Sequence, residues 1–446
     1  MKRYLIKGIQ IINEGAIREG DVCIEQGRIA AIGQALPKAA GAIEIDGSGK
    51  YLLPGLIDDQ VHFREPGLTH KAEIRTEARA AVAGGVTSYM EMPNTQPPAL
   101  TLARLEEKYA IAARSSLANY SFFMGTSNDN MEDALVVNRH KQDICGIKIF
   151  MGASTGNMLV DNPLALERLF RDSEVLIATH CEEERTIRAN IERLQASGRE
   201  LGPEDHPIIR DVDTCFASSF YAVQIAKRHQ TRLHILHIST ARELQLFSNM
   251  LPLTEKHITC EVCVHHLHFT SDDYARLGYK IKCNPAIKSP ENREALWKAL
   301  LDGTIDVIAT DHAPHTLAEK QGPYGHAHAG LPLVQHSLSL LWHCHQEGRI
   351  RLEYIAQKTA HDVADCFQIR DRGYIREGYF ADLVIVDPGA PNTVTTSNIL
   401  YKCGWSPFEG FQFPCSITHT FISGHLAYAQ GQFYDDVMGQ RMTFNR

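Results

Sequence analysis

Apolar and polar positions follow two different patterns along this chain. Between residues 53 and 370, short apolar runs are separated by longer amphipathic stretches. The apolar runs have the length of buried strands and lie at 55–58, 87–92, 120–125, 146–151, 175–180, 233–238, 258–263 and 305–310. The stretches between them carry apolar residues three and four positions apart. This spacing predicts helices, for example at 71–83, 102–114, 182–194 and 292–300.

Alternating strands and helices indicate a parallel sheet covered by helices, and eight strands are enough to close a (β/α)8 TIM barrel. The two ends of the chain differ from this pattern. DVCIEQGRIAAIG and ADLVIVD show the two-residue alternation of antiparallel strands, with glycine turns. Neither end has enough apolar surface for a separate domain. We therefore predict a catalytic barrel at 53–370, flanked by one small β-sandwich built from 1–52 and 371–446.

Composition narrows the range of partners. The 446 residues are 44% hydrophobic, enough for a large core, and the formal charge of −8 argues against nucleic acid or an anionic membrane. We expect a small-molecule substrate. No apolar segment approaches the ~20 residues of a membrane span and no signal peptide is visible, so we expect a cytoplasmic protein. The eleven cysteines are spread singly and are interpreted as reduced core residues. Cys260 and Cys263 lie in one predicted strand. For this pair too, reduced core residues are favoured over a redox or zinc CxxC site.

Polar residues recur at the ends of the predicted strands, where a barrel of this kind gathers its catalytic groups. The residues in this register are His62, Lys148, His180, His237, Asp311, His312 and His315. Imidazoles with a carboxylate suit Zn²⁺, and an open coordination position leaves room for a water nucleophile. A single buried histidine is more often a hydrogen-bonded core residue than a ligand. The joint placement favours a metal site, whereas His140, His229 and His361 are assigned to the surface.

Lys148 lies within an apolar predicted strand. Burial near metals lowers the pKa of an ammonium group, and the neutral amine can then react with carbon dioxide. The resulting carbamate has two anionic oxygens, which can bridge two ions about 3.5 to 4 Å apart. The alternative is that Lys148 forms an ordinary structural ion pair.

Several sequence blocks resemble the amidohydrolase superfamily and, more narrowly, the class I dihydroorotases. The resemblance runs almost end to end, and several blocks in order are more specific than any one. The blocks are PGLIDDQVHFREPG at 54–67, AGGVTSYMEMPNTQP at 83–97, GIKIFMGAST at 146–155, ATHCEEE at 178–184, LHISTA at 236–241, KCNPAIKSPENREAL at 282–296, IDVIATDHAPHT at 305–316 and RGYIREGYFADLVIVD at 372–387.

The resemblance implies roles for individual residues. His180 and His237 would bind one Zn²⁺, and carboxylated Lys148 would bridge to a second held by His62 and Asp311. Asp311 would also shuttle the proton. The residues implied to contact substrate are Arg64 and Asn94 at its carboxylate, Asn284 and His315, and Tyr324 and Gly325 through the backbone. The implied reaction is the reversible hydrolysis of dihydroorotate to N-carbamoyl-L-aspartate in de novo pyrimidine biosynthesis, by a homodimer or homotetramer.

One residue departs from the family pattern. The first strand usually ends in an H-x-H pair, and here Gln60 replaces the first histidine. An amide oxygen is a weaker ligand, so one or two ions per chain are both compatible with the sequence, and Asp58 or Asp59 is a possible substitute. A hydantoinase or allantoinase is an alternative activity, although Arg64 and the MPNT motif favour a substrate with a carboxylate. A non-catalytic assembly subunit is a further alternative. His326 and His328 are expected to face solvent.

Overall fold

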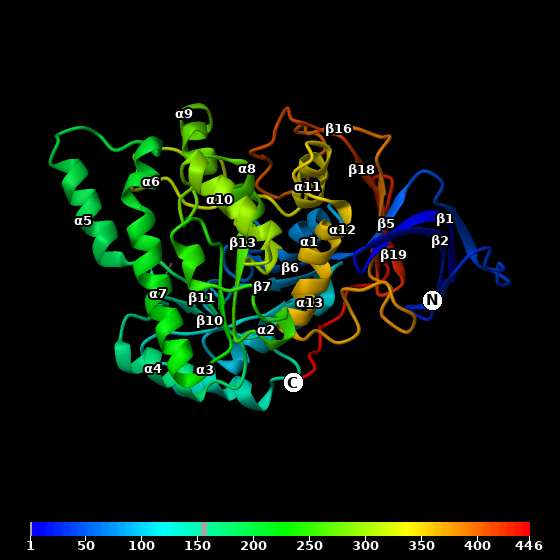
Figure 1. Ribbon diagram of the computed structural model, residues 1–446, viewed down its shortest axis with the longest axis horizontal. Helices are drawn as coiled ribbons and strands as arrows, with labels where there is room; N and C mark the ends of the chain where they lie inside the picture. The colour runs from blue at the N-terminus through cyan, green and yellow to red at the C-terminus, as the bar shows by residue number, and fades with distance from the viewer. Residues whose placement is uncertain (1, 153–157) are drawn as a thin grey trace.

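The computed structural model describes residues 2–152 and 158–446. The last three residues of the block at 146–155 lie outside the described residues. Figure 1 shows a barrel on one side and a β domain on the other. Among the described residues, no helix has the length and apolar character needed to cross a bilayer.

The barrel strands pair in parallel in the order of the chain. They are β6 (Leu56–Val61), β7 (Val86–Glu91), β8 (Asn119–Phe122) continued by β9 (Met124–Gly125), β10 (Ile147–Phe150), β11 (Ile177–His180), β12 (Leu233–Ile235), β13 (Ile258–Cys263) and β14 (Val307–Ala309). A parallel bridge between Val61 and His312 closes the ring, and the His62 N–H donates to the His312 carbonyl at 2.7 Å. All the strands predicted at 53–370 are present, so the predicted barrel is confirmed.

The four helices predicted as examples are present and lie outside the strands. The longer helices are α1 (Ile74–Ala83), α2 (Leu102–Ser115), α4 (Pro163–Asp172), α5 (Glu184–Gln195), α7 (Val212–His229), α10 (Pro290–Leu301) and α11 (Ser337–Gln346). The shorter ones are α3 (Met131–Leu135), α6 (His206–Ile209), α8 (Val264–His268), α9 (Tyr274–Leu277), α12 (Leu352–Ala356) and α13 (Asp362–Phe367). Helix α1 begins three residues later than predicted, because a capping box between Glu73 and Thr76 fixes its first turn.

The two chain ends meet in one nine-stranded sheet. It contains β1 (Tyr4–Asn13), β2 (Ala16–Glu25), β3 (Arg28–Gly33), β4 (Ile43–Asp46), β5 (Tyr51–Pro54), β15 (Leu383–Asp387), β18 (Ser416–Ile422), β19 (His425–Ala429) and β20 (Gln432–Phe433). The join is the antiparallel pair of β5 and β15. A separate two-stranded ribbon is made by β16 (Asn392–Thr393) and β17 (Gln412–Phe413).

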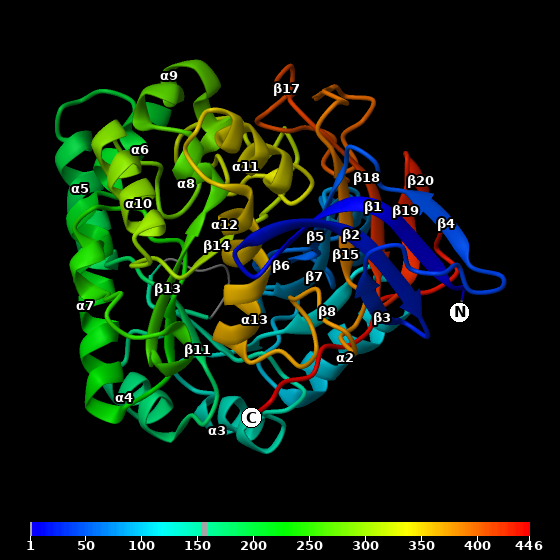
Figure 2. The ribbon, with the colours of Figure 1, turned by 45° about the vertical axis from the view of Figure 1, so that its right-hand side comes forward.

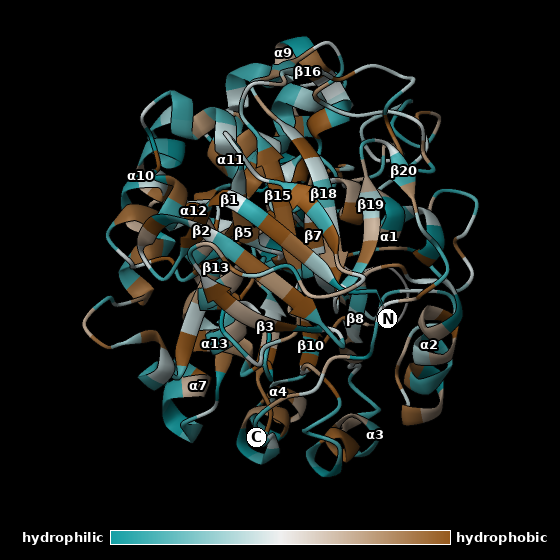
Figure 3. Cartoon of the chain, turned by 90° about the vertical axis from the view of Figure 1, so that its right-hand side faces the viewer, coloured by the Kyte–Doolittle hydropathy of each residue, from teal (hydrophilic) through white to brown (hydrophobic). Residues whose placement is uncertain are grey.

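Both chain ends also share one apolar core. The rings of Tyr4 and Phe421, from opposite ends of the sequence, lie 5.2 Å apart between centroids. Figure 2 shows β1, β2, β18 and β19 together beside the barrel, and Figure 3 shows apolar segments running along β1 and β15. The predicted β domain built from both ends is therefore confirmed. The exact domain boundaries stay predictions, and strand β5 spans the first of them.

Candidate active site

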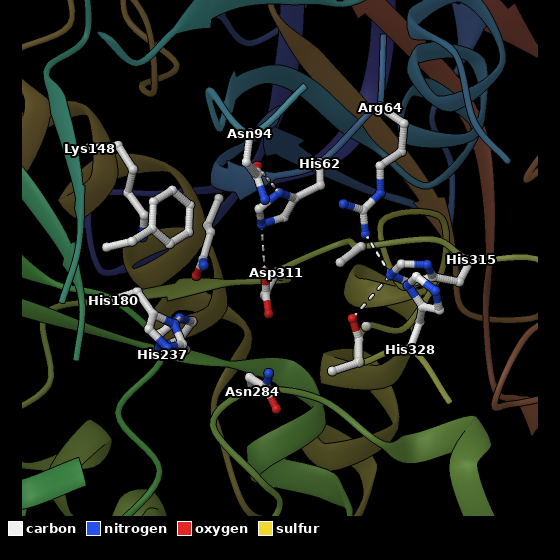
Figure 4. Close-up of a pocket in the computed structure, with 15 residues that line it drawn as sticks. His62, Arg64, Asn94, Lys148, His180, His237, Asn284, Asp311, His315 and His328 are labelled. Carbon is white, nitrogen blue, oxygen red and sulfur yellow. Dashed lines mark hydrogen bonds and ion pairs between the residues drawn. The ribbon is translucent and has the colours of Figure 1, made fainter. Parts of the chain in front are cut away.

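A cavity of about 250 Å³ opens where the barrel strands end. Its lining residues are Gln60, His62, Arg64, Asn94, Lys148, Phe150, His180, His237, Asn284, Asp311, Ala313, His315, His328, Ala329 and Gly330. Figure 4 shows Lys148, His180 and His237 on one side and Arg64, His315 and His328 on the other, with His62 and Asp311 between them. The structure therefore brings together every predicted metal ligand and four of the six residues predicted to contact substrate.

His180 and His237 present ring nitrogens to each other. Nδ1 of His180 lies 3.0 Å from Nε2 of His237, while Nε2 of His180 lies 3.0 Å from a carboxylate oxygen of Glu182. Burial alone raises the pKa of Glu182, but Arg210 and His180 hold it at about 2. The ionised Glu182 accepts a hydrogen bond from the Nε2–H group of His180, which leaves the Nδ1 lone pair facing His237. A carboxylate behind a histidine in this way is typical of metal ligands.

Glu182 and its ion-paired neighbour Arg210 were not singled out from the sequence. Glu182 follows His180 by two residues, and this short spacing is the feature of the sequence that could have indicated their hydrogen bond. Arg210 gives no comparable signal, because it lies 28 residues away from Glu182 in the sequence.

His62 and Asp311 form the second pair of donors. Nε2 of His62 lies 3.2 Å from Oδ1 of Asp311, and Nδ1 lies 2.8 Å from Oδ1 of Asn94. Burial lowers the pKa of His62 and favours the neutral ring, although Asp311 opposes this. When Nδ1 donates its proton to Asn94, a lone pair on Nε2 faces the carboxylate. Two acceptors at this separation suit a shared cation.

Lys148 is 1% exposed and lines the cavity on the same side as His180 and His237. Burial lowers its pKa to about 7, although Glu261 and Asp311 oppose the shift. Near neutral pH, a large fraction of this amine is unprotonated, and the unprotonated amine is the form that reacts with carbon dioxide. The chemistry of the donor set therefore fits a bridging carbamate between two cations.

Gln60 is buried and lines the cavity, but the neighbouring aspartates do not. Asp58 accepts hydrogen bonds from the hydroxyl and the N–H of Thr310, at 2.6 and 3.2 Å. Asp59 lies 3.3 Å from Nε2 of His234, beside Glu261 in the barrel interior. Neither carboxylate takes the place of the missing imidazole in this arrangement.

Arg64 and His315 face each other at the other side of the cavity. Nη2 of Arg64 lies 3.0 Å from Nε2 of His315, and Nε of Arg64 donates to the Pro314 carbonyl at 3.2 Å. Lys71 was not predicted to take part, yet its Nζ lies 3.1 Å from Nδ1 of His315 and 2.9 Å from Glu319. The cavity thus has a cationic end with no carboxylate among its described lining residues on that side.

Three site residues have left-handed backbone conformations, with φ of 68° at Arg64, 39° at His237 and 47° at Asp311. Such conformations cost roughly 1 to 3 kcal/mol each in residues other than glycine, and they persist where surrounding contacts impose them. At His237 one such contact is visible, because its N–H donates to Glu261 at 3.0 Å.

Tyr324 and Gly325 do not line the cavity. The Tyr324 hydroxyl lies 2.7 Å from Nδ1 of His206, and the Tyr324 carbonyl accepts a hydrogen bond from Lys282 at 2.6 Å. In the same loop, His326 and His328 are exposed as expected. His328 nevertheless also borders the cavity, with its ring centroid 4.8 Å from that of His315.

The assignment of His361 to the surface was wrong. Its ring is buried, and Nδ1 and Nε2 bond to the Gly373 carbonyl and the Glu14 N–H at 2.6 and 3.0 Å. It is a core histidine with both nitrogens satisfied. Its partner Glu14 is 347 residues distant in the sequence, so no local pattern reveals this burial.

Known proteins resemble this chain along almost its whole length. A model of the amidohydrolase family matches residues 51–427. A dihydroorotase of Halobacterium salinarum is 33% identical over 414 residues, covering 90% of this chain and 92% of that protein. An allantoinase of Desulfitobacterium hafniense is 29% identical over 450 residues, covering 98% of both. The solved structure of an L-hydantoinase from Arthrobacter aurescens matches with a TM-score of 0.91 at 24% identity, covering 99% of this chain and 100% of that one. The chain belongs to the amidohydrolase family.

Proposed function

We propose that the protein is a dihydroorotase, a metal-dependent hydrolase that opens or closes the cyclic amide of (S)-dihydroorotate. The observation that supports the proposal most is that the two sides of the cavity carry different chemical groups. Metal-type donors gather at one side, and the guanidinium of Arg64 beside His315 occupies the other. A substrate with a ring amide at one end and a carboxylate at the other matches both sides.

The proposed ligands form two sets around Lys148. Carboxylated Lys148 with His180 and His237 would hold one Zn²⁺, and Lys148 with His62 and Asp311 would hold a second. When bound, such ions supply Lewis acidity and lower the pKa of a coordinated water. Glu182 orients His180 for this task, as its hydrogen bond to Nε2 fixes the ring and the tautomer.

Asp311 is the proposed proton shuttle. Its carboxylate lies on the cavity lining between the two sides, 3.2 Å from His62. During hydrolysis it accepts the proton of the attacking water as the new carbon–oxygen bond forms. It then delivers that proton to the ring nitrogen as the carbon–nitrogen bond breaks, which yields N-carbamoyl-L-aspartate. Ring closure follows the same steps in reverse.

Arg64 with Asn94, Asn284 and His315 is proposed to orient the substrate. A guanidinium pairs with a carboxylate through two parallel hydrogen bonds. The Oδ1 atom of Asn284 has no hydrogen-bond partner among the described residues, so it is free to accept a hydrogen bond from the ring N–H of the substrate. Loop residues Tyr324 and Gly325 are proposed to reach the substrate through their backbone.

A second candidate function is that of a hydantoinase or allantoinase. Allantoinases of similar length are among the relatives of this chain, which supports this candidate. Hydantoin has no carboxylate to occupy the Arg64 side. Turnover of dihydroorotate, hydantoin and allantoin by the metal-loaded enzyme separates the two candidates. We expect dihydroorotate to be preferred, and Asp311→Asn to lower its turnover about a hundredfold or more. Preferential turnover of hydantoin or allantoin would contradict the proposal, and absence of all three activities would favour an assembly subunit.

A further inference from the structure

Three ionisable side chains from different strands meet inside the barrel. Asp59 on β6, His234 on β12 and Glu261 on β13 are each 0% exposed. Nε2 of His234 lies 3.3 Å from Oδ2 of Asp59 and 3.3 Å from Oε2 of Glu261. One donor atom from each residue lies within 4.8 Å of the other two. None of the three residues lines the cavity, so this cluster is separate from the candidate active site.

The two carboxylates of the cluster have no cationic side chain beside them. Within the described part of the chain, neither Asp59 nor Glu261 forms an ion pair with a lysine or an arginine. Both carboxylate oxygens of Asp59 also lack a hydrogen-bond partner among these residues. Burying a carboxylate that is neither paired nor hydrogen-bonded costs several kcal/mol or more. The cluster therefore calls for a positive charge between its oxygens.

The His234 ring can present a lone pair to both carboxylates. Its Nδ1 atom lies 2.8 Å from Oγ1 of Thr259, and that hydroxyl donates to the Leu233 carbonyl at 3.3 Å. Because the hydroxyl has one hydrogen, it accepts from the Nδ1–H group in this arrangement. The lone pair of Nε2 then faces Asp59 and Glu261. A ring nitrogen held by a hydrogen bond behind an open Nε2 is typical of histidines that bind metal.

The separations within the cluster fit an ion at its centre. Donors bound at about 2.0 to 2.2 Å around a tetrahedral ion lie about 3.3 to 3.6 Å from one another, which matches the two 3.3 Å separations. A proton on Nε2 fits less well. It has hydrogen-bond geometry toward Glu261 only, so Asp59 would stay unpaired. A divalent cation bonds both carboxylates at once, and oxygen donors with an imidazole suit zinc.

We propose that Asp59, His234 and Glu261 bind one Zn²⁺ ion in the barrel interior, in addition to the ions proposed for the cavity. The role of this ion would be structural. Oε1 of Glu261 accepts the N–H of His237 at 3.0 Å, where the backbone has its left-handed φ of 39°, and Oε2 is left for the ion. Because all three ligands are completely buried, the ion enters as the barrel folds and leaves only when the barrel opens.

Crystals of the full chain grown with zinc chloride test this directly. Anomalous difference maps from data on either side of the zinc absorption edge should show a peak about 2.0 to 2.2 Å from Nε2 of His234, between the two carboxylates. No peak at this position would overturn the proposal. A peak in the cavity alone would overturn it without touching the proposed function. A peak at the cluster in a protein that ignores dihydroorotate would refute only the proposed function.

Metal analysis after chelation gives an independent test in solution. A chelator applied to the native protein reaches ions in the open cavity, so we expect about one resistant ion per chain, which is released on unfolding. In Asp59→Asn the resistant ion should be lost, because an amide is a weaker ligand without charge. Asp58→Asn is the matched control, since the Asp58 carboxylate is also buried but bonds to Thr310, and there the ion remains.

Two results in solution would overturn the interior site. One is a native chain that loses all of its metal to the chelator while it stays folded. The other is a resistant ion that persists in Asp59→Asn. If Asp59→Asn yields no folded protein, the native crystal and the native chelation experiment still decide the question.

Discussion

Lys71 lies behind His315, with Nζ of the lysine 3.1 Å from Nδ1 of the imidazole. Burial and the nearby charge of Arg64 lower the pKa of His315, so the ring is neutral. An ammonium group only donates, so Nδ1 accepts and the single ring proton sits on Nε2. That proton points to the Ala329 carbonyl at 3.1 Å. The Arg64 Nη2 group then finds no acceptor on His315 and remains available to a substrate carboxylate.

This arrangement predicts that Lys71→Met weakens substrate binding more than it slows chemistry. Loss of a charge-assisted hydrogen bond costs about 1.5 to 3 kcal/mol, so KM for dihydroorotate should rise about tenfold or more with kcat little changed. Lys71→Arg should keep most of the affinity. Steady-state kinetics of both variants provide the check, and an equal loss of kcat in Lys71→Met would point to general disruption instead.

Arg64→Gln should discriminate between substrates. Truncating one partner of a buried charge pair typically costs 2 to 5 kcal/mol, so kcat/KM for dihydroorotate should fall about a hundredfold or more. A cyclic amide without a carboxylate, such as dihydrouracil or hydantoin, loses no such pair. Any slow turnover of those compounds by the native enzyme should therefore be almost unchanged in the variant. An equal loss of kcat/KM on both kinds of substrate would show that Arg64 does not bind the substrate carboxylate.

Glu182→Gln should weaken metal binding without removing a ligand. The carboxylate holds His180 by a 3.0 Å hydrogen bond, and loss of such a partner typically costs 10- to 100-fold in metal affinity. Competition with a chelator measures this affinity directly. Glu192→Gln is the control, since Glu192 is exposed on α5. Unchanged affinity in Glu182→Gln would show that the Glu182 carboxylate is not needed to hold the His180 ring for metal binding.

A buried ion pair near the site should contribute strongly to the free energy of unfolding. Lys108 and Glu91 lie 2.9 Å apart with exposures of 1% and 0%, and Glu91 also accepts the Phe63 N–H beside His62. Lys108→Met leaves a buried carboxylate without its cation, which should lower the free energy of unfolding by about 3 to 5 kcal/mol. The double variant Lys108→Met, Glu91→Gln should be less destabilised than the single one. Denaturant unfolding distinguishes these outcomes, and equal stability of the two variants would argue against the pair.

The barrel strands and the polar residues at their ends were predictable because both depend on local pattern. Short apolar runs mark strands, and residues such as His180 and Asp311 stand where the strands end. Partners that lie far apart in the chain were not predictable. Lys71 and His315 are 244 positions apart, and Gln60 and Cys263 are 203 apart. Alternation along β13 shows that Cys263 is in a strand, but only the closed barrel shows what its sulfur faces.

The proposed activity requires that this cavity binds metal and hydrolyses dihydroorotate. The most direct test measures the metal content of the purified chain together with its turnover of dihydroorotate and hydantoin, before and after removal of metal by a chelator. We expect about two ions per chain that the chelator removes, a strong preference for dihydroorotate, and loss of turnover that returns when Zn²⁺ is restored. A metal-free protein with no turnover after Zn²⁺ is added, or one that prefers hydantoin, would contradict the proposed function.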